Sequence, residues 1–212
     1  MLYTPHGGLW VLEGRNILLT YSLSMVDDRL TDEHEILKKA IAGESSAFGS
    51  LYDIYQPLLY RFIYLRVSHR EEAEDLTHQV FLSAWQNIGS FQEQGLPISS
   101  WLYQIARNRV IDYYRTKHVS ISLDTETEDI HPSLDDIADS LETKIQLEHI
   151  RTALRSLHPD QQDIIIMRFV EGLSNAEVAA ALKKHEGTVR VLQHRALRTL
   201  KKQLEKRHEH EL

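Results

Sequence analysis

Residues 71–115 restrict the fold of this 212-residue chain more than any other stretch, because two amphipathic helical patterns flank one short loop. Ser68 precedes the first pattern with Glu71 at the capping-box spacing, which predicts that a helix begins at Ser68. The loop between the patterns contains Gly95 and Pro97. In the first helix, residues at helical spacing predict one broad buried side, formed by Ala73, Leu76, Val80, Phe81, Ala84 and Ile88.

The opposite side of the first helix is polar with one exception. It carries Glu72, Asp75, Gln79 and Gln86, and Leu82 lies among them. A leucine inside a polar stripe suggests docking onto a partner, but single surface leucines are also common in monomers. The geometry of the stripe fits both interpretations equally well.

The second helical pattern also has two distinct sides. Its buried side is formed by Leu102, Ile105, Ala106, Val110 and Tyr113, and its other side by Trp101, Gln104, Asn108, Ile111 and Arg115. A tryptophan can stack on a base, an asparagine can bond its edge and an arginine can hold a phosphate. An ordinary helix with a half-buried tryptophan fits the same residues, so this pattern alone does not establish nucleic-acid binding.

The segments AEDLTHQVFLSAW and WLYQIARNRVIDYYR together closely resemble region two of bacterial RNA polymerase sigma factors of the extracytoplasmic-function (ECF) type. The resemblance implies two roles for this stretch. One is docking on the β′ clamp helices of core polymerase, through Asp75, His78, Gln79, Leu82 and Gln86. The other is reading and melting of the promoter −10 element, with capture of a flipped base, through Phe91, Trp101, Gln104, Asn108 and Arg115. For Phe91 a structural role fits nearly as well, in which it plugs the domain core and Trp101 packs beside it.

The charge distribution matters more than the net charge of −7, which by itself argues against nucleic-acid binding. Acidic residues gather between positions 124 and 139, and basic residues gather between 183 and 207. The chain has no cysteine, which excludes a disulfide scaffold and fits a reducing cytoplasm. It also has no apolar run long enough to cross a bilayer, so we expect no direct membrane insertion.

The chain divides into segments by composition. Residues 1–24 show no clear period, and we expect little order there. Met25 is an alternative start that would make residues 1–24 an artefact of gene calling; a short regulatory extension is the other interpretation. Residues 25–117 form a first helical domain, with a helix at 32–42 ended by Gly43 and a second helix that Pro57 is expected to break or kink.

Residues 118–140 are predicted to be an acidic linker, because their few apolar side chains cannot offset the entropy of ordering. A second helical domain follows at 141–207. Its apolar residues Leu147, Ile150, Leu154 and Leu157 recur at helical spacing. Pro159 suits a first helical turn, Gly172 ends that helix, and Ser174 with Glu177 forms a capping box for the next. The predicted fold is all-α, with two small helical domains joined by a flexible linker.

The last helix, opening at Glu186 or Gly187, completes a helix-turn-helix pattern. Its inner side consists of Val189, Leu192, Ala196, Leu200 and Leu204, and its outer side of Arg190, Val191, His194, Arg195, Arg198, Lys201 and Lys202. Such an outer side fits the major groove, although a merely solvated charged face has the same composition. The capped helix and the turn immediately upstream favour DNA.

The segments EGLSNAEVAAAL and EGTVRVLQHRALRTL resemble region four of the same sigma factors, so both matches occur in the family's order. The resemblance implies that the last helix reads the −35 element through Arg190, Val191, His194, Arg195 and Arg198. It also implies contact with the polymerase β flap and binding by an anti-sigma factor. This chain departs from the family pattern at His78-Gln79, Gln92, Lys183 and His185, where Gln-Glu, arginine, glycine and serine are usual.

The resemblance of both halves implies a non-enzymatic sigma factor that binds core polymerase, recognises a promoter and helps to open it. The sequence has no HExxH pair, phosphate-binding glycine loop or nucleophile–base set, so we expect no cofactor, metal or small-molecule substrate. His208 to Glu211 could hold a metal, but a solvated tail at 208–212 is the interpretation we adopt. The alternatives are a stand-alone helix-turn-helix regulator and an interaction module that reads no promoter.

Overall fold

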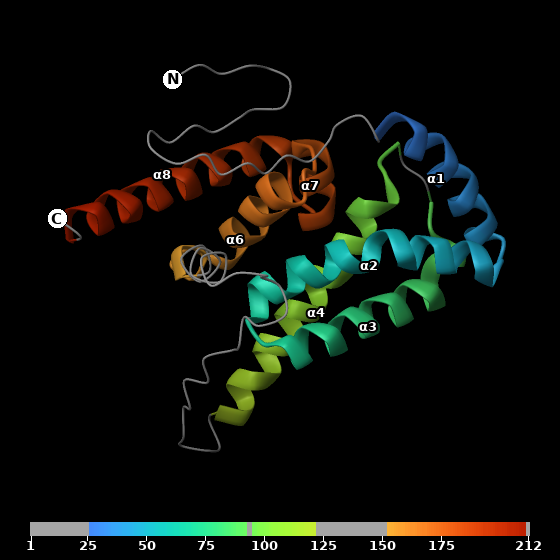
Figure 1. Cartoon of the computed structure of the whole chain (residues 1–212), viewed down its shortest axis with the longest axis horizontal. Helices are drawn as coiled ribbons and strands as arrows, with labels where there is room; N and C mark the ends of the chain where they lie inside the picture. Colours follow the sequence, from blue (N-terminus) through green and yellow to red (C-terminus); the bar gives the residue numbers. More distant parts are fainter. Residues whose placement is uncertain (1–25, 93–94, 122–151, 211–212) are drawn as a thin grey trace. The chain divides into compact units, whose positions relative to one another are not determined.

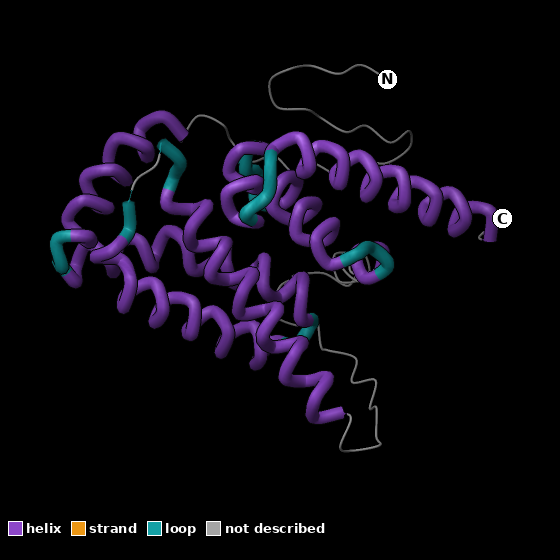
Figure 2. Tube along the Cα trace, turned by 180° about the vertical axis from the view of Figure 1, so that it is seen from behind, coloured by secondary structure: helices purple, strands orange, loops and turns teal. Residues whose placement is uncertain are grey.

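The computed structural model describes residues 26–92, 95–121 and 152–210 (Figure 1). The predictions for residues 1–24 and for most of the linker therefore lie outside the described residues, as do Leu147 and Ile150. The chain divides into two compact units, Met1–Glu35 and Ile36–Leu212, and the architecture below is that of the second unit. Every regular element in the described ranges is a helix, as Figure 2 shows, which confirms the predicted all-α class.

The first bundle consists of three helices, α2 (Ser45–Val67), α3 (Arg70–Asn87) and α4 (Ile98–Ile121), with a short 3-10 turn η2 (Ile88–Ser90) after α3. The helix before it, α1 (Val26–Ile41), begins six residues earlier than the predicted helix and ends where expected, because Gly43 has a φ of +93°. The centre of the first bundle contains Phe62 and Tyr103, whose rings meet edge to face with centroids 5.5 Å apart.

Pro57 was predicted to break or kink the second helix, and it does not break α2. The helix runs from Ser45 to Val67 as one element with Pro57 inside it. Proline removes the N–H that would bond to the carbonyl of Asp53, four residues earlier. Both residues are exposed, so water can take up the free carbonyl and the helix continues.

The predicted capping box at Ser68 is wrong. Ser68 ends α2 instead of beginning α3: its φ is +67°, it is buried, and its N–H donates to the carbonyl oxygen of Tyr64 at 2.9 Å. Helix α3 begins at Arg70 behind His69, and no side chain caps it. The connection between α2 and α3 is short. Because Ser68 terminates α2, it cannot also cap α3.

The second bundle consists of α6 (Pro159–Ile165), its π-helical continuation η3 (Ile166–Val170), α7 (Asn175–Leu182) and α8 (Glu186–His210). Pro159 occupies the first turn of α6, and Gly172, with φ +77°, follows η3, both as predicted. Helix α8 continues three residues beyond the predicted boundary at 207. Leu154 and Leu157 are buried beside α6.

The two bundles pack against each other, which the sequence patterns did not predict. The most extensive pairing between them is that of α4 with α7, and η3 also contacts α2. The buried apolar residues form one continuous cluster that includes members of both bundles. Figures 1 and 2 show from opposite sides that α6 and α7 lie beside the helices of the first bundle.

Candidate nucleic-acid and polymerase interfaces

The helix-turn-helix is built by local capping. The Ser174 hydroxyl accepts from the Glu177 N–H at 3.2 Å, and the Glu177 carboxylate accepts from the Ser174 N–H at 2.7 Å, so the predicted capping box of α7 is confirmed. Lys183 ends α7 in the left-handed conformation, with φ 52° and ψ 45°. Helix α8 begins three residues later, and Val189 and Ala196 fix its inner side because both are completely buried.

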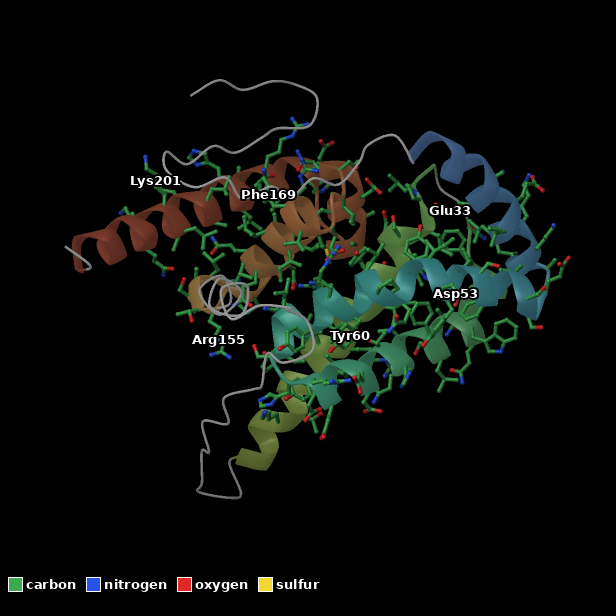
Figure 3. The ribbon with its side chains drawn as sticks, viewed as in Figure 1. Glu33, Asp53, Tyr60, Arg155, Phe169 and Lys201 are labelled. Carbon is green, nitrogen blue, oxygen red and sulfur yellow. The ribbon has the colours of Figure 1, made fainter. Side chains whose placement is uncertain are left out.

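The outer side of α8 is open to solvent. Arg190, His194, Arg195 and Arg198 are exposed, and so is the apolar Val191, at 51%. Lys201 extends the basic face along α8 (Figure 3). Arg190 is held by Glu186 one turn earlier, with Nη2 at 2.6 Å from Oε1. Exposed cations along one helix face suit the phosphates and base edges of a major groove.

A pocket of about 630 Å³ lies where the loop after α3 meets α4. Phe91 and Trp101 line it with ring centroids 5.2 Å apart, and Gln104 lies one turn further along α4. Gln92 lines it too. Two aromatic faces beside an amide provide both a stacking surface and an edge-reading group.

The five residues predicted to read the −10 element do not all line this pocket. Phe91, Trp101 and Gln104 do, whereas Asn108 and Arg115 are exposed further along α4 and are not among the lining residues. Arg115 forms an exposed ion pair of 3.0 Å with Asp112. The structure therefore brings together three of the five side chains and leaves two on the open surface of the same helix.

The predicted polymerase-docking seam follows the outer side of α3. Asp75, His78, Leu82 and Gln86 are exposed, and Gln79 is half-buried and donates to Asp75 at 2.8 Å. Leu82 exposes 59% of its surface, as both the docking interpretation and that of a single surface leucine require. Trp85 is also 41% exposed beside it, a residue that the sequence reasoning missed although it lies three positions after Leu82.

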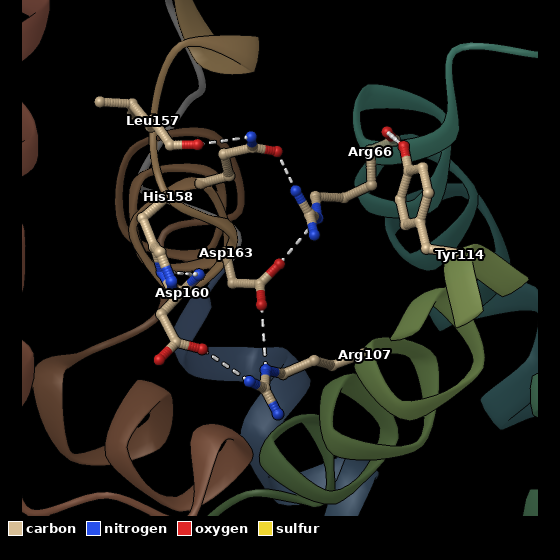
Figure 4. A network of polar contacts seen from close by, with 8 residues as sticks. Arg66, Arg107, Tyr114, Leu157, His158, Asp160 and Asp163 are labelled. Carbon is tan, nitrogen blue, oxygen red and sulfur yellow. Dashed lines mark hydrogen bonds and ion pairs between the residues drawn. The ribbon is translucent and has the colours of Figure 1, made fainter. Parts of the chain in front are cut away.

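A cluster of charged residues between the bundles was also missed (Figure 4). Asp163 of α6 is almost completely buried and lies between two guanidinium groups of the first bundle: Arg66 Nε and Arg107 Nε are each 2.9 Å from one of its oxygens. Burial raises the pKa of Asp163, and both arginines act against this effect. No sequence pattern marks which charged residues become buried, because each occupies an ordinary helical position.

Asp160 extends this cluster toward the turn after α7. It accepts from Arg107 Nη2 at 2.7 Å and pairs with Lys184 Nζ at 2.9 Å. Burial acts to raise the pKa of Asp160, but the Lys184 and Arg107 interactions outweigh it and lower the pKa overall. A second contact lies apart from this cluster, where Arg61 donates twice to Glu171, at 2.9 and 2.7 Å, and the Tyr103 hydroxyl donates to the same carboxylate.

None of the helices in the described ranges is long and apolar enough to cross a membrane.

The chain thus combines an exposed basic helix with an aromatic pocket, and the family models identify its class. Residues 51–119 match sigma-70 region 2 and residues 147–200 match sigma-70 region 4. The ECF sigma factor SigX of Bacillus subtilis is 32% identical over 168 residues, covering 74% of this chain and 84% of SigX. The chain therefore belongs to the ECF RNA polymerase sigma factors.

A second relative is the ECF sigma factor BldN of Streptomyces coelicolor, which is 40% identical over 171 residues. That match covers 78% of this chain and 63% of the length of BldN. Among solved structures, the sigma factor RpoE of Bartonella quintana, crystallised with the anti-sigma factor NepR, has 26% identity and a TM-score of 0.60 over 74% of this chain and 96% of that chain. CnrH in complex with the cytosolic domain of CnrY shares the fold, with a TM-score of 0.65 at 20% identity, over 82% of this chain and 97% of that chain.

Proposed function

We propose that this chain binds core RNA polymerase, directs it to promoters through two DNA-reading elements, and helps to separate the strands. The observation that carries the proposal is the pairing of an exposed cationic recognition helix with an aromatic pocket in one chain. A stand-alone helix-turn-helix regulator has no need of the first bundle, with its pocket and its exposed seam on α3. A module that reads no promoter has no need of the exposed cations on α8.

Helix α8 reads the −35 element in this proposal. Arg190, His194, Arg195 and Arg198 share one exposed side with Val191. Arginine can bond two atoms of guanine, and an apolar side chain can contact the thymine methyl group. The cations also hold phosphates, so binding must weaken as salt rises.

The pocket beside α4 captures a base of the −10 element. Phe91 and Trp101 supply π surfaces, and Gln104 supplies an amide at the pocket wall. Asn108 and Arg115 lie further along α4, where they meet the flanking nucleotides and the phosphate backbone. A base leaves the duplex only if stacking and hydrogen bonds return the few kcal/mol that unstacking costs.

The seam on α3 docks onto the β′ clamp helices of core polymerase. Its exposed leucine is flanked by Asp75, His78, Gln79 and Gln86, which gives an apolar contact with a polar rim. The second bundle meets the β flap. We further propose that an anti-sigma factor controls the chain, as NepR binds RpoE. The chain acts in the cytoplasm in this proposal. The polymerase, and not this chain, catalyses RNA synthesis.

Transcription with purified core polymerase, with and without this protein, tests the proposal. Promoter-specific transcripts that require the protein are expected. DNA binding by the protein alone, with no effect on polymerase, would instead indicate a stand-alone regulator. Polymerase binding without promoter-specific transcripts would indicate an interaction module.

A further inference from the structure

The outer side of α8 begins with a pair of opposite charges. Arg190 Nη2 lies 2.6 Å from Glu186 Oε1, and the two side chains are 66% and 43% exposed. Among the residues that the structure describes, neither Arg195 nor Arg198 pairs with a carboxylate. Arg190 thus differs from the other two arginines of this side, because the chain itself holds its guanidinium.

The pair follows from the place of Glu186 in the helix. Glu186 is the first residue of α8, and Arg190 lies one turn later on the same face. A carboxylate four residues before a cation is the favourable order for such a pair. Val189 and Ala196 are completely buried and fix the rotation of α8, so both members of the pair lie on its exposed side.

The pair leaves part of the Arg190 guanidinium free. An arginine fork carries five N–H donors, and the Glu186 oxygen at Nη2 accepts one of them. Whichever Nη2 hydrogen is used, one edge with two donors remains, and two such donors match the O6 and N7 acceptors of guanine. Arginine loses much side-chain entropy when it binds, so a guanidinium that is already held binds a base at a lower cost.

The same carboxylate disfavours a phosphate contact. Glu186 already neutralises Arg190, and its negative charge repels a phosphate close to the fork. Specificity rises when the wrong partner is disfavoured as well as when the right one is favoured. An exposed ion pair at this spacing adds little to stability, so its main consequence is the choice of partner for Arg190.

We propose that Glu186 is a positioning residue that makes Arg190 the reader of a guanine in the −35 element, whereas Arg195 and Arg198 remain free to hold phosphates. This inference rests on the proposed role of α8 in −35 recognition. Glu186 holds the guanidinium on the outer side of α8 and disfavours its contact with the DNA backbone. The −35 element should therefore contain one guanine whose recognition requires both Arg190 and Glu186.

Transcription from a promoter library tests this inference. The holoenzyme, assembled from core polymerase and the full chain, transcribes barcoded templates that are randomised at both promoter elements. The wild type should prefer guanine at one −35 position, and Arg190→Ala should abolish this preference. Glu186→Gln should lower it by about fivefold or more, because the guanidinium is released, and should leave the preferences at other positions unchanged.

A double variant shows whether Glu186 acts through Arg190. Adding Glu186→Gln to Arg190→Ala should change the base preferences no further, because the group that Glu186 holds is already absent. The matched control is Glu74→Gln, which removes the exposed Arg70–Glu74 pair of α3 at the same spacing and should retain the full guanine preference. A purely structural role of Glu186 would instead lower transcription from every −35 sequence alike, and that outcome overturns the proposal.

The salt dependence of holoenzyme binding to a duplex without the preferred −35 sequence gives a second readout. Released from Glu186, Arg190 should neutralise an additional phosphate. Glu186→Gln should therefore bind this duplex more tightly and steepen the plot of log affinity against log salt by about 0.9. Adding Arg190→Ala should return the slope to the wild-type value. An unchanged slope in Glu186→Gln would overturn the claim that Glu186 keeps Arg190 from the phosphates.

The library separates failure of this inference from failure of the proposed function. If the wild type gives no promoter-specific transcripts, or if Arg190→Ala keeps every −35 preference, the proposed reading of the promoter by Arg190 fails. If Arg190→Ala abolishes a guanine preference that Glu186→Gln retains in full, α8 reads the promoter as proposed and the role of Glu186 is overturned. If Arg190 selects another base, the assignment of guanine is overturned.

Discussion

Asn108 is an exposed polar residue of the helix that carries the predicted −10 residues. It lies on α4 beyond the pocket residues and is exposed, so its side chain serves no core. Asn108→Ala should therefore fold normally and bind core polymerase with unchanged affinity. Promoter opening, measured as permanganate reactivity of unpaired thymines, should fall by about 10-fold or more, because the variant loses hydrogen bonds to a base edge.

A promoter with a pre-opened mismatch provides the control for Asn108→Ala. Transcription by the variant from this promoter should recover the part of the defect that is due to strand melting. Wild-type opening of the intact duplex by the variant would show that Asn108 takes no part in reading the opened strand.

Lys183 carries backbone strain in the turn before the recognition helix. Its φ of 52° lies in the left-handed region, which costs a side-chain-bearing residue about 1 kcal/mol or more. The side chain is exposed. Lys183→Gly should therefore raise the free energy of unfolding by up to about 1 kcal/mol, measured by thermal or urea denaturation.

Lys202→Gly is the matched control, because this exposed lysine lies within α8, where glycine should lower stability by about 1 kcal/mol. Equal destabilisation by both substitutions would show that the Lys183 conformation carries no strain.

At the scale of the element, α3 has a buried side and an exposed side. Its inner side packs in the bundle, and its outer side presents Leu82. Leu82→Arg should leave the helicity of the free protein unchanged, because the side chain is 59% exposed. Affinity for core polymerase, measured by fluorescence anisotropy, should fall at least about 10-fold, since a cation buried in the interface would have no partner. Unchanged affinity would show that polymerase docks elsewhere on the chain.

Substitution of the outer cations of α8 tests its proposed role in promoter recognition. Arg190→Ala and Arg195→Ala remove exposed side chains and should leave the fold intact. Promoter-specific initiation should fall, with each lost base contact worth about 1–3 kcal/mol. The salt dependence of DNA binding should also become shallower. A double variant that transcribes the promoter like wild type would show that another element reads it.

Local signals predicted some elements well and others poorly. The Ser174–Glu177 capping box formed as expected because both bonds lie within one turn of α7. The same pattern at Ser68 and Glu71 failed, because tertiary packing used Ser68 to end α2. Pro57 also did not break its helix, since Pro57 and Asp53, whose carbonyl loses its partner, are both exposed. Spacing identifies a helix face, but it does not determine which of two adjoining helices a single capping residue serves.

At the scale of the whole molecule, the sequence predicted the two bundles but not their contact. Both the exposed seam on α3 and the outer side of α8 could be read from helical periodicity. The partners of Arg66 and Arg107 could not, because Asp160 and Asp163 lie more than fifty residues away and look like ordinary helix-surface residues. Three of the five residues predicted to read the −10 element share the pocket, and periodicity alone could not show that it ends before Asn108.

The contact between the two bundles predicts how the whole molecule unfolds. The buried apolar residues are continuous across both bundles, so the wild type should melt in one cooperative transition. Asp163→Asn leaves Arg66 without its carboxylate partner and Arg107 with only that of Asp160, and it should loosen the contact between the bundles, so that calorimetry shows two resolved transitions. A loss of about 3 kcal/mol would place the first of them about 10 °C below the wild-type midpoint. Glu74→Gln should keep the single transition, because its ion pair is exposed and lies within one helix. One transition in Asp163→Asn, shifted no more than in Glu74→Gln, would show that the bundles stay together without this cluster.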